Sequence, residues 1–286
     1  MTSFKKTQPI VSFPFFVFPH AFHNLDDMVK RKRESISSLR GKNYDLFIDV
    51  DPLDKSKKAV LARETIGKEA ERLGYSGCAF VHRVKGRLGA KDENPNGPGV
   101  VDSVEEQPGF KQYSRLHLIL SDPSQGHNLN MNNQVVRSFD ILSVEPKSEK
   151  VFTQCCQNLE VDIITINCED RLPYRLSRSM VKLAIERGIS FELCFREPLT
   201  DSSTRRFFVS NGVALQRVTK GKSILISSAA TDRIELRSPL DACSLGTLFD
   251  LDMATSRETV RRAAEVVLLN AEKRGVYGSV IKATRV

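Results

Sequence analysis

The chain has 286 residues, of which 40% are hydrophobic and 27% are charged, and its formal net charge at pH 7 is +8. These values are ordinary for a globular protein and exclude a disordered or fibrous chain. No apolar run approaches the roughly 18 residues of a membrane-spanning helix, so we expect no membrane contact.

Residues 1–43 are expected to form a weakly structured N-terminal extension. The apolar run Ile10–Phe18 imitates a secretory signal, but Pro14 interrupts it and no small-residue cleavage site follows. Within the extension, Lys30–Arg33 is an uninterrupted basic run. Such a run serves as a nuclear import signal or a nucleic-acid contact, and equally as a solvated charge cluster.

From Tyr44 onward, short runs rich in β-branched and aromatic residues alternate with longer amphipathic segments. Continuous apolar runs of this length are typical of strands buried in a parallel sheet. The pattern predicts seven strands, at residues 44–50, 77–82, 114–120, 139–144, 161–166, 190–195 and 223–227. This many strand–helix units in about 240 residues favour a TIM-barrel-like (β/α) barrel over a doubly wound sheet. We expect one α/β barrel domain over residues 44–286, with a long loop rich in Gly and Pro at 83–109.

Two of the segments between strands carry clear helix punctuation. Residues 57–73 place Leu61 and other apolar residues roughly along one stripe and stop at Gly74. Ser177 is expected to cap a helix that Gly188 ends.

The last helix is expected to open with a capping box formed by Thr255 and Glu258. Its apolar stripe should seal the bottom or side of the core. The stripe consists of Val260, Ala263, Ala264, Val267 and Leu268.

The six cysteines form no C-x-x-C pair and no zinc-finger spacing. Several lie inside apolar runs, such as Cys194 between Leu193 and Phe195. We therefore expect buried free thiols in a reducing compartment.

Acidic residues and a histidine follow the first two strands, at the carboxyl ends where parallel α/β folds place their sites. The first strand ends in Asp49-Val50-Asp51 and the second in His82-Arg83. Two carboxylates two residues apart on one strand point to the same face, and His82 would supply a third ligand for a divalent ion. No second histidine cluster completes a hydrolytic centre, so the alternative is that Asp49 and Asp51 bind loop amides. We predict no cofactor and keep these three residues as weak metal candidates.

Basic residues follow the later strands and supply the predicted RNA contacts. Between Arg171 and Arg237 the chain has thirteen Lys and Arg residues against six Asp and Glu residues. Such a concentration of positive charge is typical of a polyanion-binding surface. The candidates are Arg171, Arg175, Arg178, Arg205, Arg206, Lys220, Lys222, Arg233 and Arg237.

Arg205 and Arg206 follow Asp201-Ser202, a good helix cap, and so belong to the first turn of a helix. Arginines are unfavourable there because the helix dipole is already positive. A bound phosphate would stabilise them. The alternative is that one pairs with Asp201 or Glu197 and the other faces solvent.

No catalytic residues are predicted. The chain has no G-x-S-x-G, no P-loop and no G-x-G-x-x-G after a strand. Aromatic residues are few on the presumed functional face and Trp is absent, which argues against base stacking. This composition favours recognition of the backbone or shape of a folded RNA.

Several motifs in succession resemble one known family. They are Leu159–Ile163, Arg171–Tyr174, Ala184–Leu193, Asp201–Arg206 and Lys220–Ala230, together with Ser121–Ser124 and Arg237–Leu240. Over residues 44–275 this succession resembles the thirty-kilodalton protein subunit of eukaryotic ribonuclease P and RNase MRP.

The resemblance implies a barrel related to the polymerase and histidinol phosphatase (PHP) metalloenzymes. Asp51 and Leu53 stand where those enzymes carry their first pair of metal-binding histidines, and only His82 matches a later ligand. The resemblance also implies that the subunit does not cleave RNA itself, because the RNA of the particle is the catalyst.

The partners that the resemblance implies are ribonuclease P RNA, RNase MRP RNA, precursor tRNA indirectly, and other protein subunits, especially a small protein-five-type partner. The implied roles are removal of tRNA 5′ leaders and rRNA processing, in the nucleus and nucleolus. Two other functions stay open. One is a metal-dependent phosphoesterase of the PHP type that uses Asp49, Asp51 and His82, and the other is an assembly protein whose basic strip meets an acidic protein.

Overall fold

The computed structural model describes residues 39–98, 101 and 109–283. The chain separates into two units, residues 1–39 and 40–286, and the second is described by itself here. The basic run Lys30–Arg33 lies outside the described residues, so the predicted N-terminal extension stays a prediction.

Seven strands form one sheet in which each strand pairs in parallel with the next along the chain. The last strand returns to the first, because the Ala229 amide donates to the Phe47 carbonyl and the Asp49 amide to the Ala230 carbonyl, both at 2.8 Å. The predicted α/β barrel of seven parallel strands is confirmed. The strands are β1 (Tyr44–Ile48), β2 (Gly77–Lys85), β3 (Lys111–Leu120), β4 (Ile141–Pro146), β5 (Ile163–Thr165), β6 (Ser190–Cys194) and β7 (Ile224–Ser227).

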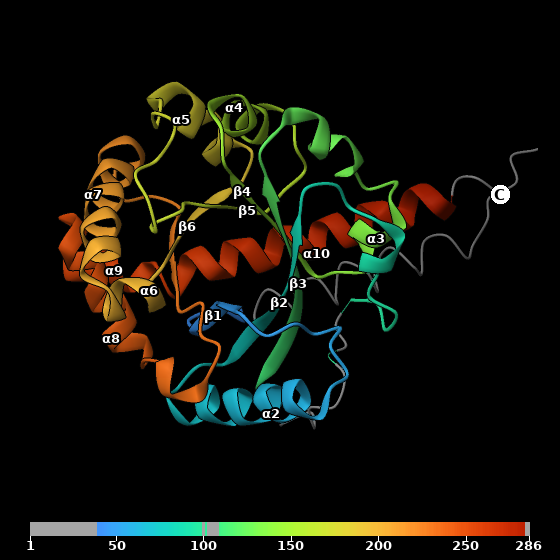
Figure 1. The fold of residues 1–286 in the computed structure, drawn as a ribbon, viewed down its shortest axis with the longest axis horizontal. Coiled ribbons are helices and arrows are strands. Elements are labelled where there is room, and N and C mark those ends of the chain that lie inside the picture. Colours follow the sequence, from blue (N-terminus) through green and yellow to red (C-terminus); the bar gives the residue numbers. More distant parts are fainter. Residues whose placement is uncertain (1–38, 99–100, 102–108, 284–286) are drawn as a thin grey trace, which may run out of the picture. The chain divides into compact units, whose positions relative to one another are not determined.

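Helices surround the strands. The longer ones on the outside are α2 (Lys57–Arg72), α4 (Glu149–Gln157), α5 (Arg178–Glu186) and α7 (Ser202–Thr219), as Figure 1 shows. The others are α3 (Gln134–Arg137), α6 (Arg196–Thr200), α8 (Pro239–Ser244), α9 (Met253–Glu258) and α10 (Arg262–Ala283), with 3-10 turns η1 (Ala90–Asp92), η2 (Pro123–Asn128), η3 (Arg233–Glu235) and η4 (Leu245–Phe249). Within the described ranges, each helix is too short or too polar to cross a membrane.

The predicted helix punctuation is mostly confirmed. Gly74 and Gly188 follow α2 and α5 with φ of 98° and 85°, in the left-handed region that glycine adopts without strain. Ser177 is the N-cap residue of α5, but its hydroxyl interacts with the Ser179 hydroxyl and makes no cap hydrogen bond. Leu61 of α2 is 60% exposed, so the apolar stripe predicted for this helix is wrong at that position.

The predicted start of the last helix is also wrong. Asp252 caps the short helix α9, where its carboxylate accepts from the amides of Ala254 and Thr255. Glu258 ends α9, and α10 begins only at Arg262. Asp252, and not Thr255, is the N-cap residue because an ionised carboxylate accepts stronger hydrogen bonds from the first helical amides than a threonine hydroxyl does.

The long helix α10 covers the amino ends of the strands (Figure 1). The Arg274 guanidinium donates to the Asp140 carbonyl at 2.6 Å and to the Asp162 carboxylate at 2.7 Å, just before β4 and β5. The Tyr44 amide at the start of β1 donates to the Val260 carbonyl. The predicted apolar stripe, Val260, Ala263, Ala264, Val267 and Leu268, is buried, so this end of the core is sealed as expected.

The predicted loop at 83–109 starts later than expected, because β2 continues through Lys85. Asp92 and Asn94 in the loop are buried, and the Asn94 amide donates to the Ser138 hydroxyl at 2.9 Å. The described part of the loop is therefore packed against α3. Residues 99–100 and 102–108 lie outside the described residues.

The barrel interior holds a buried ion pair between Arg115 of β3 and Glu192 of β6. Both side chains are 0% exposed, and the two guanidinium nitrogens of Arg115 meet the two carboxylate oxygens of Glu192 at 2.7 and 2.5 Å. Hydroxyls complete the shell: Ser143 accepts from Arg115, Thr165 bridges both partners, and Ser227 donates to Glu192. Burial alone would raise the pKa of Glu192, but Arg115 and these hydroxyls lower it overall. The pair is therefore ionised and fully satisfied.

Replacing Arg115 with Met should leave Glu192 charged, buried and without its counter-ion. We expect the free energy of unfolding in urea to fall by about 3–5 kcal/mol. The double variant Arg115→Met/Glu192→Leu should recover most of this loss, since it removes the orphaned charge. Lys182→Ala serves as the control, because Lys182 pairs with Glu186 on the surface and its loss should cost about 0.5 kcal/mol or less. Equal losses for Arg115→Met and Lys182→Ala would contradict the role of the buried pair.

Asp45 lies at the seam between β1 and β7. Its side chain is 1% exposed, and one carboxylate oxygen accepts from the amides of Phe47 and Ser228, each at 3.2 Å. The other oxygen has no hydrogen-bond partner among the described residues. Burial raises the pKa of Asp45 from its ordinary 3.8 to about 6. The seam therefore favours the neutral carboxyl.

Because the pKa of Asp45 is raised by folding, its contribution to stability is largest below pH 4 and is lost as the pH rises through about 6. Asp45→Asn removes this titration. Between pH 5 and pH 8, the wild-type free energy of unfolding should fall by about 1.4 kcal/mol relative to Asp45→Asn. Urea titrations of both proteins at the two pH values measure this difference. A gap between them that does not change with pH would contradict the raised pKa.

Candidate nucleic-acid interface

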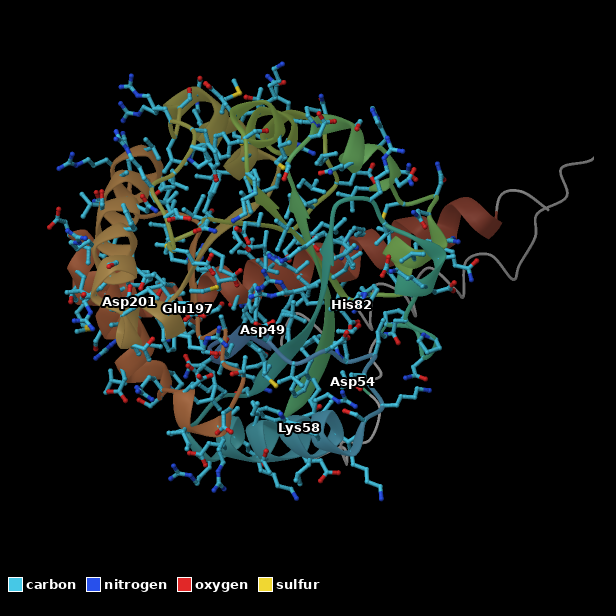
Figure 2. The ribbon with its side chains drawn as sticks, viewed as in Figure 1. Asp49, Asp54, Lys58, His82, Glu197 and Asp201 are labelled. Atoms are coloured by element: carbon cyan, nitrogen blue, oxygen red, sulfur yellow. The ribbon has the colours of Figure 1, made fainter. Side chains whose placement is uncertain are left out.

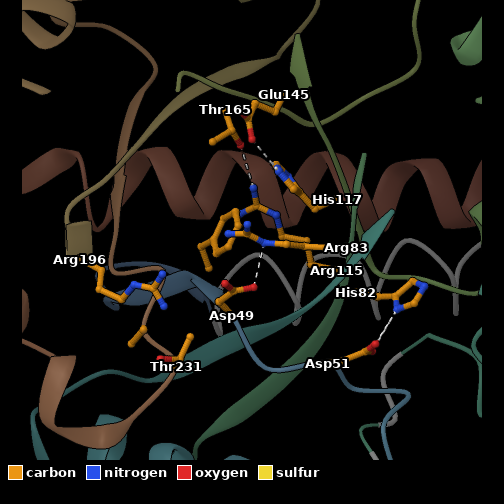
Figure 3. Close-up of polar contacts among 12 residues, drawn as sticks. Asp49, Asp51, His82, Arg83, Arg115, His117, Glu145, Thr165, Arg196 and Thr231 are labelled. Carbon is orange, nitrogen blue, oxygen red and sulfur yellow. Dashed lines mark hydrogen bonds and ion pairs between the residues drawn. The ribbon is translucent and has the colours of Figure 1, made fainter. Parts of the chain in front are cut away.

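The mouth of the barrel, at the carboxyl ends of the strands, holds Asp49 but not its predicted metal partners. The Asp49 carboxylate pairs with the Arg83 guanidinium at 2.8 Å. The guanidinium groups of Arg83 and of the interior residue Arg115 both lie over the Phe47 ring. Arg83 and its partner Asp49 therefore face the barrel interior. His82 precedes Arg83 on β2, and neighbouring residues of a strand point to opposite faces. Figure 3 shows His82 and Asp51 together, apart from Asp49 and Arg83.

His82 lies outside the barrel wall between two carboxylates. Its Nδ1 is 2.9 Å from Asp51, its Nε2 is 3.3 Å from Asp92, and its ring stacks on Phe139. Burial would lower the pKa of His82, but Asp51 and Asp92 raise it overall. His82 therefore ties the loop after β1 to the loop after β2, and neither ring nitrogen is free for a metal.

The hypothesis that the weak metal candidates Asp49, Asp51 and His82 share one site is therefore contradicted. Asp51 follows the end of β1 at Ile48, so the strand alternation that placed both carboxylates on one face no longer applies there. No cluster of three or more His, Cys, Asp or Glu residues suited to a metal ion occurs among the described residues. The phosphoesterase alternative loses its geometric basis.

A second polar group in the mouth was missed by the sequence reasoning. The Glu145 carboxylate accepts from Lys147 at 2.5 Å and Asn167 at 2.8 Å, and lies 3.5 Å from His117. Burial alone would raise the pKa of Glu145, but these neighbours lower it to about 2. The sequence feature that could have predicted this group is the alternation of side chains along β3, which turns His117 inward together with Arg115. The carboxylates of the mouth are therefore held in ion pairs.

Arg171, Arg175 and Arg178 lie in the loop after β5 and at the first residue of α5. All three side chains are exposed, and none of them makes a hydrogen bond or ion pair with any described residue. The Arg206 side chain is also exposed and unpaired among these residues, but Arg206 is the fifth residue of α7 and so lies just beyond the first turn that the sequence predicted for it. We call these four residues the carboxyl-end arginines, because each follows the carboxyl end of a strand.

Asp201 caps α7 as predicted, where its carboxylate accepts from the Thr204 amide at 2.8 Å. Figure 2 shows Glu197 and Asp201 close together where α6 leads into α7. Arg205 pairs with neither. Its guanidinium donates to the carbonyls of Pro198 and Leu199, at 2.9 and 3.2 Å, and so caps the end of α6.

The remaining predicted contacts are divided between the two ends of the barrel. Arg233 lies in η3, after β7, and Arg237 follows with its guanidinium on the carbonyls of Ile234 and Leu236. Lys220 and Lys222 are exposed in the loop that enters β7, at the amino ends of the strands. The prediction of one basic face is therefore wrong for Lys220 and Lys222, because strand-end reasoning treated residues before and after β7 alike.

A profile of the family described as RNase P subunit p30 matches residues 42–275. The chain belongs to this family. The p30-family chain is 35% identical to the mouse ribonuclease P protein subunit p30 over 62% of its own length and 66% of the mouse protein. It is 33% identical to the probable ribonuclease P protein subunit 3 of Schizosaccharomyces pombe over 75% of its length and 88% of the yeast protein. The predicted family is confirmed.

The fold of the p30-family chain also resembles a solved structure. A chain in the cryo-EM structure of archaeal ribonuclease P with mature tRNA matches it with a TM-score of 0.53 at 17% identity. The match covers 85% of this chain and 94% of the archaeal one. At this identity the likeness supports the barrel fold alone.

The two adjacent arginines of α7 should differ in their effect on stability. Arg205→Ala removes hydrogen bonds to two carbonyls and should lower the free energy of unfolding by about 1 kcal/mol. Arg206→Ala removes no hydrogen bond or ion pair with a described residue and should change it by less than about 0.5 kcal/mol. Urea unfolding of the two variants makes the comparison, and equal losses would contradict the assignment of Arg205 to the end of α6.

Proposed function

We propose that this p30-family chain is a non-catalytic, RNA-binding protein subunit of ribonuclease P that supports removal of 5′ leaders from precursor tRNA. The observation that carries the proposal is the set of four exposed, unpaired carboxyl-end arginines. They lie in the loop after β5, at the start of α5 and in α7, beside a mouth in which the Asp49 and Glu145 carboxylates are in ion pairs. The four arginines therefore offer unpaired positive charge to a ligand at this end of the barrel, and the ligand they suit is a polyanion.

The carboxyl-end arginines suit phosphate groups better than the carboxylates of a protein. Arg206 is the fifth residue of α7, and its exposed side chain has no ion-pair partner among the described residues. The flat guanidinium groups of the carboxyl-end arginines can bind phosphate oxygens in pairs. The absence of Trp from the sequence favours contact with the RNA backbone over base stacking.

We also propose the finer roles that the family resemblance implies. These are binding of RNase MRP RNA, a part in rRNA processing, pairing with a small protein-five-type subunit, and residence in the nucleus and nucleolus. A Saccharomyces cerevisiae relative named as a ribonuclease P/MRP subunit supports the first, at 33% identity over 59% of this chain and 57% of that protein. Import would depend on Lys30–Arg33, and a fluorescent fusion lacking these charges tests it.

The triple variant Arg171→Ala/Arg175→Ala/Arg178→Ala tests the RNA surface. Each phosphate that the variant no longer binds should reduce the slope of log affinity against log salt by about 0.7–0.9. The cognate ribonuclease P RNA should therefore bind with a slope shallower by about 2 and at least tenfold more weakly at moderate salt. Filter binding across a salt series measures both quantities.

The matched control is Lys57→Ala/Lys58→Ala/Lys68→Ala, which removes the same charge from exposed positions of α2. Its slope and affinity should stay close to wild type. If the two triple variants weaken binding equally, the effect is one of net charge, and the carboxyl-end arginines are not the RNA contact.

A further inference from the structure

Exposed apolar side chains are concentrated in one short segment. Of the six large hydrophobic side chains that are exposed among the described residues, four lie between residues 234 and 253. They are Ile234, Leu240, Leu248 and Met253. The helices α8, η4 and α9 that carry three of them pack against one another, and α8 and α9 lie side by side in Figure 1. Single exposed apolar residues are normal, but a cluster marks an interaction surface.

A cleft opens beside Leu240, which is 57% exposed. Its volume is about 180 Å³. A cavity of about 150 Å³ lined by apolar side chains accepts a benzene-sized group, so this cleft has room for one leucine or phenylalanine side chain. Its apolar lining consists of Pro239, Leu240, Cys243 and Val260.

The rim of the cleft is cationic. Arg257 and Arg261 line it, and Arg262 follows in the sequence. Arg261 pairs with Glu258, whereas Arg257 is exposed and makes no hydrogen bond or ion pair within the described part of the chain. A carboxylate next to the inserted apolar side chain would complete this arrangement.

The chemistry of the cleft favours a protein over an RNA. An RNA backbone would use only the arginines of the rim and would leave the apolar lining of the cleft without a partner. An apolar pocket ringed by charge is the arrangement of a protein–protein anchor site. The exposed Leu248 and Met253 nearby would add apolar contact area to such a partner.

We propose that the α8–α9 cleft binds an acidic segment of another protein, which inserts one leucine- or phenylalanine-sized side chain and places a carboxylate on Arg257. The proposal rests on the proposed function in one respect, since it seeks that protein among the subunits of the ribonuclease P particle. The surface lies apart from the carboxyl-end arginines, because Asn43, immediately before β1, also lines the cleft. RNA and this partner could therefore bind the chain together.

The test places the photo-crosslinking residue p-benzoylphenylalanine at Leu240 of the tagged full chain and isolates the assembled particle. The same residue at Leu61, which is 60% exposed on α2, is the control. We expect a protein crosslink from position 240, mapped to a peptide with an apolar residue next to Asp or Glu, and none from position 61. Crosslinks from position 240 to RNA, or none at all, would overturn the proposal.

A second part of the experiment reverses the charge at the rim of the cleft. Arg257→Glu should reduce the crosslink from position 240 at least tenfold, while Lys58→Glu on α2 should leave it unchanged. An undiminished crosslink in Arg257→Glu would also overturn the proposal. The RNA content of each preparation separates the two hypotheses: absence of ribonuclease P RNA from wild type contradicts the proposed function, whereas normal RNA without the protein crosslink contradicts only the cleft.

Discussion

The buried pair of Arg115 and Glu192 sets the conditions for the rest of the barrel. It joins β3 to β6 across the interior, and its hydrogen bonds reach hydroxyls of β4, β5 and β7 and the Leu46 carbonyl of β1. A buried charge tolerates little movement of its partners, because leaving either one unpaired is costly. The pair therefore fixes where six of the seven strands lie, and it fills the barrel interior with a polar core where other barrels pack apolar side chains.

The charge that a ligand could meet lies in the loops at the carboxyl ends of the strands. The carboxylates of the mouth, Asp49 and Glu145, are neutralised by Arg83 and Lys147, so the mouth has little net charge of its own. The unpaired cations lie around it, on the loop after β5 and the start of α7. A surface of this kind suits a long, flexible polyanion, which can make many weak phosphate contacts over a wide area.

The strands were predictable because each is a continuous apolar run, and the ends of α2 and α5 were predictable because Gly74 and Gly188 can adopt positive φ. The buried arginines were not. Arg63 is fully buried and donates to the carbonyls of Asp51 and Asp54, and Arg115 meets a carboxylate 77 residues away. Their partners lie on other elements, so local periodicity carries no sign of them.

The candidate site was predictable in its charge but only partly in its layout. The basic window from Arg171 to Arg237 predicted a polyanion surface, yet the sequence could not show that Arg205 caps α6. The position of Lys220 at the opposite end of the barrel was predictable, because Lys220 precedes the predicted strand at 223–227. The sequence pattern also grouped Asp51 with Asp49, although the chain leaves β1 between Ile48 and Asp51. Spacing along a strand predicts a shared face only while the strand continues.

The most direct measurement is ultraviolet crosslinking of the assembled particle, followed by mass spectrometry of the nucleotide-bearing peptides from this chain. The account predicts crosslinked nucleotides on peptides from 167–178 and 201–206, where the carboxyl-end arginines lie. Peptides from α2 should carry none. Crosslinks confined to α2 or to the loop that enters β7, with the carboxyl-end peptides unmodified, would contradict it.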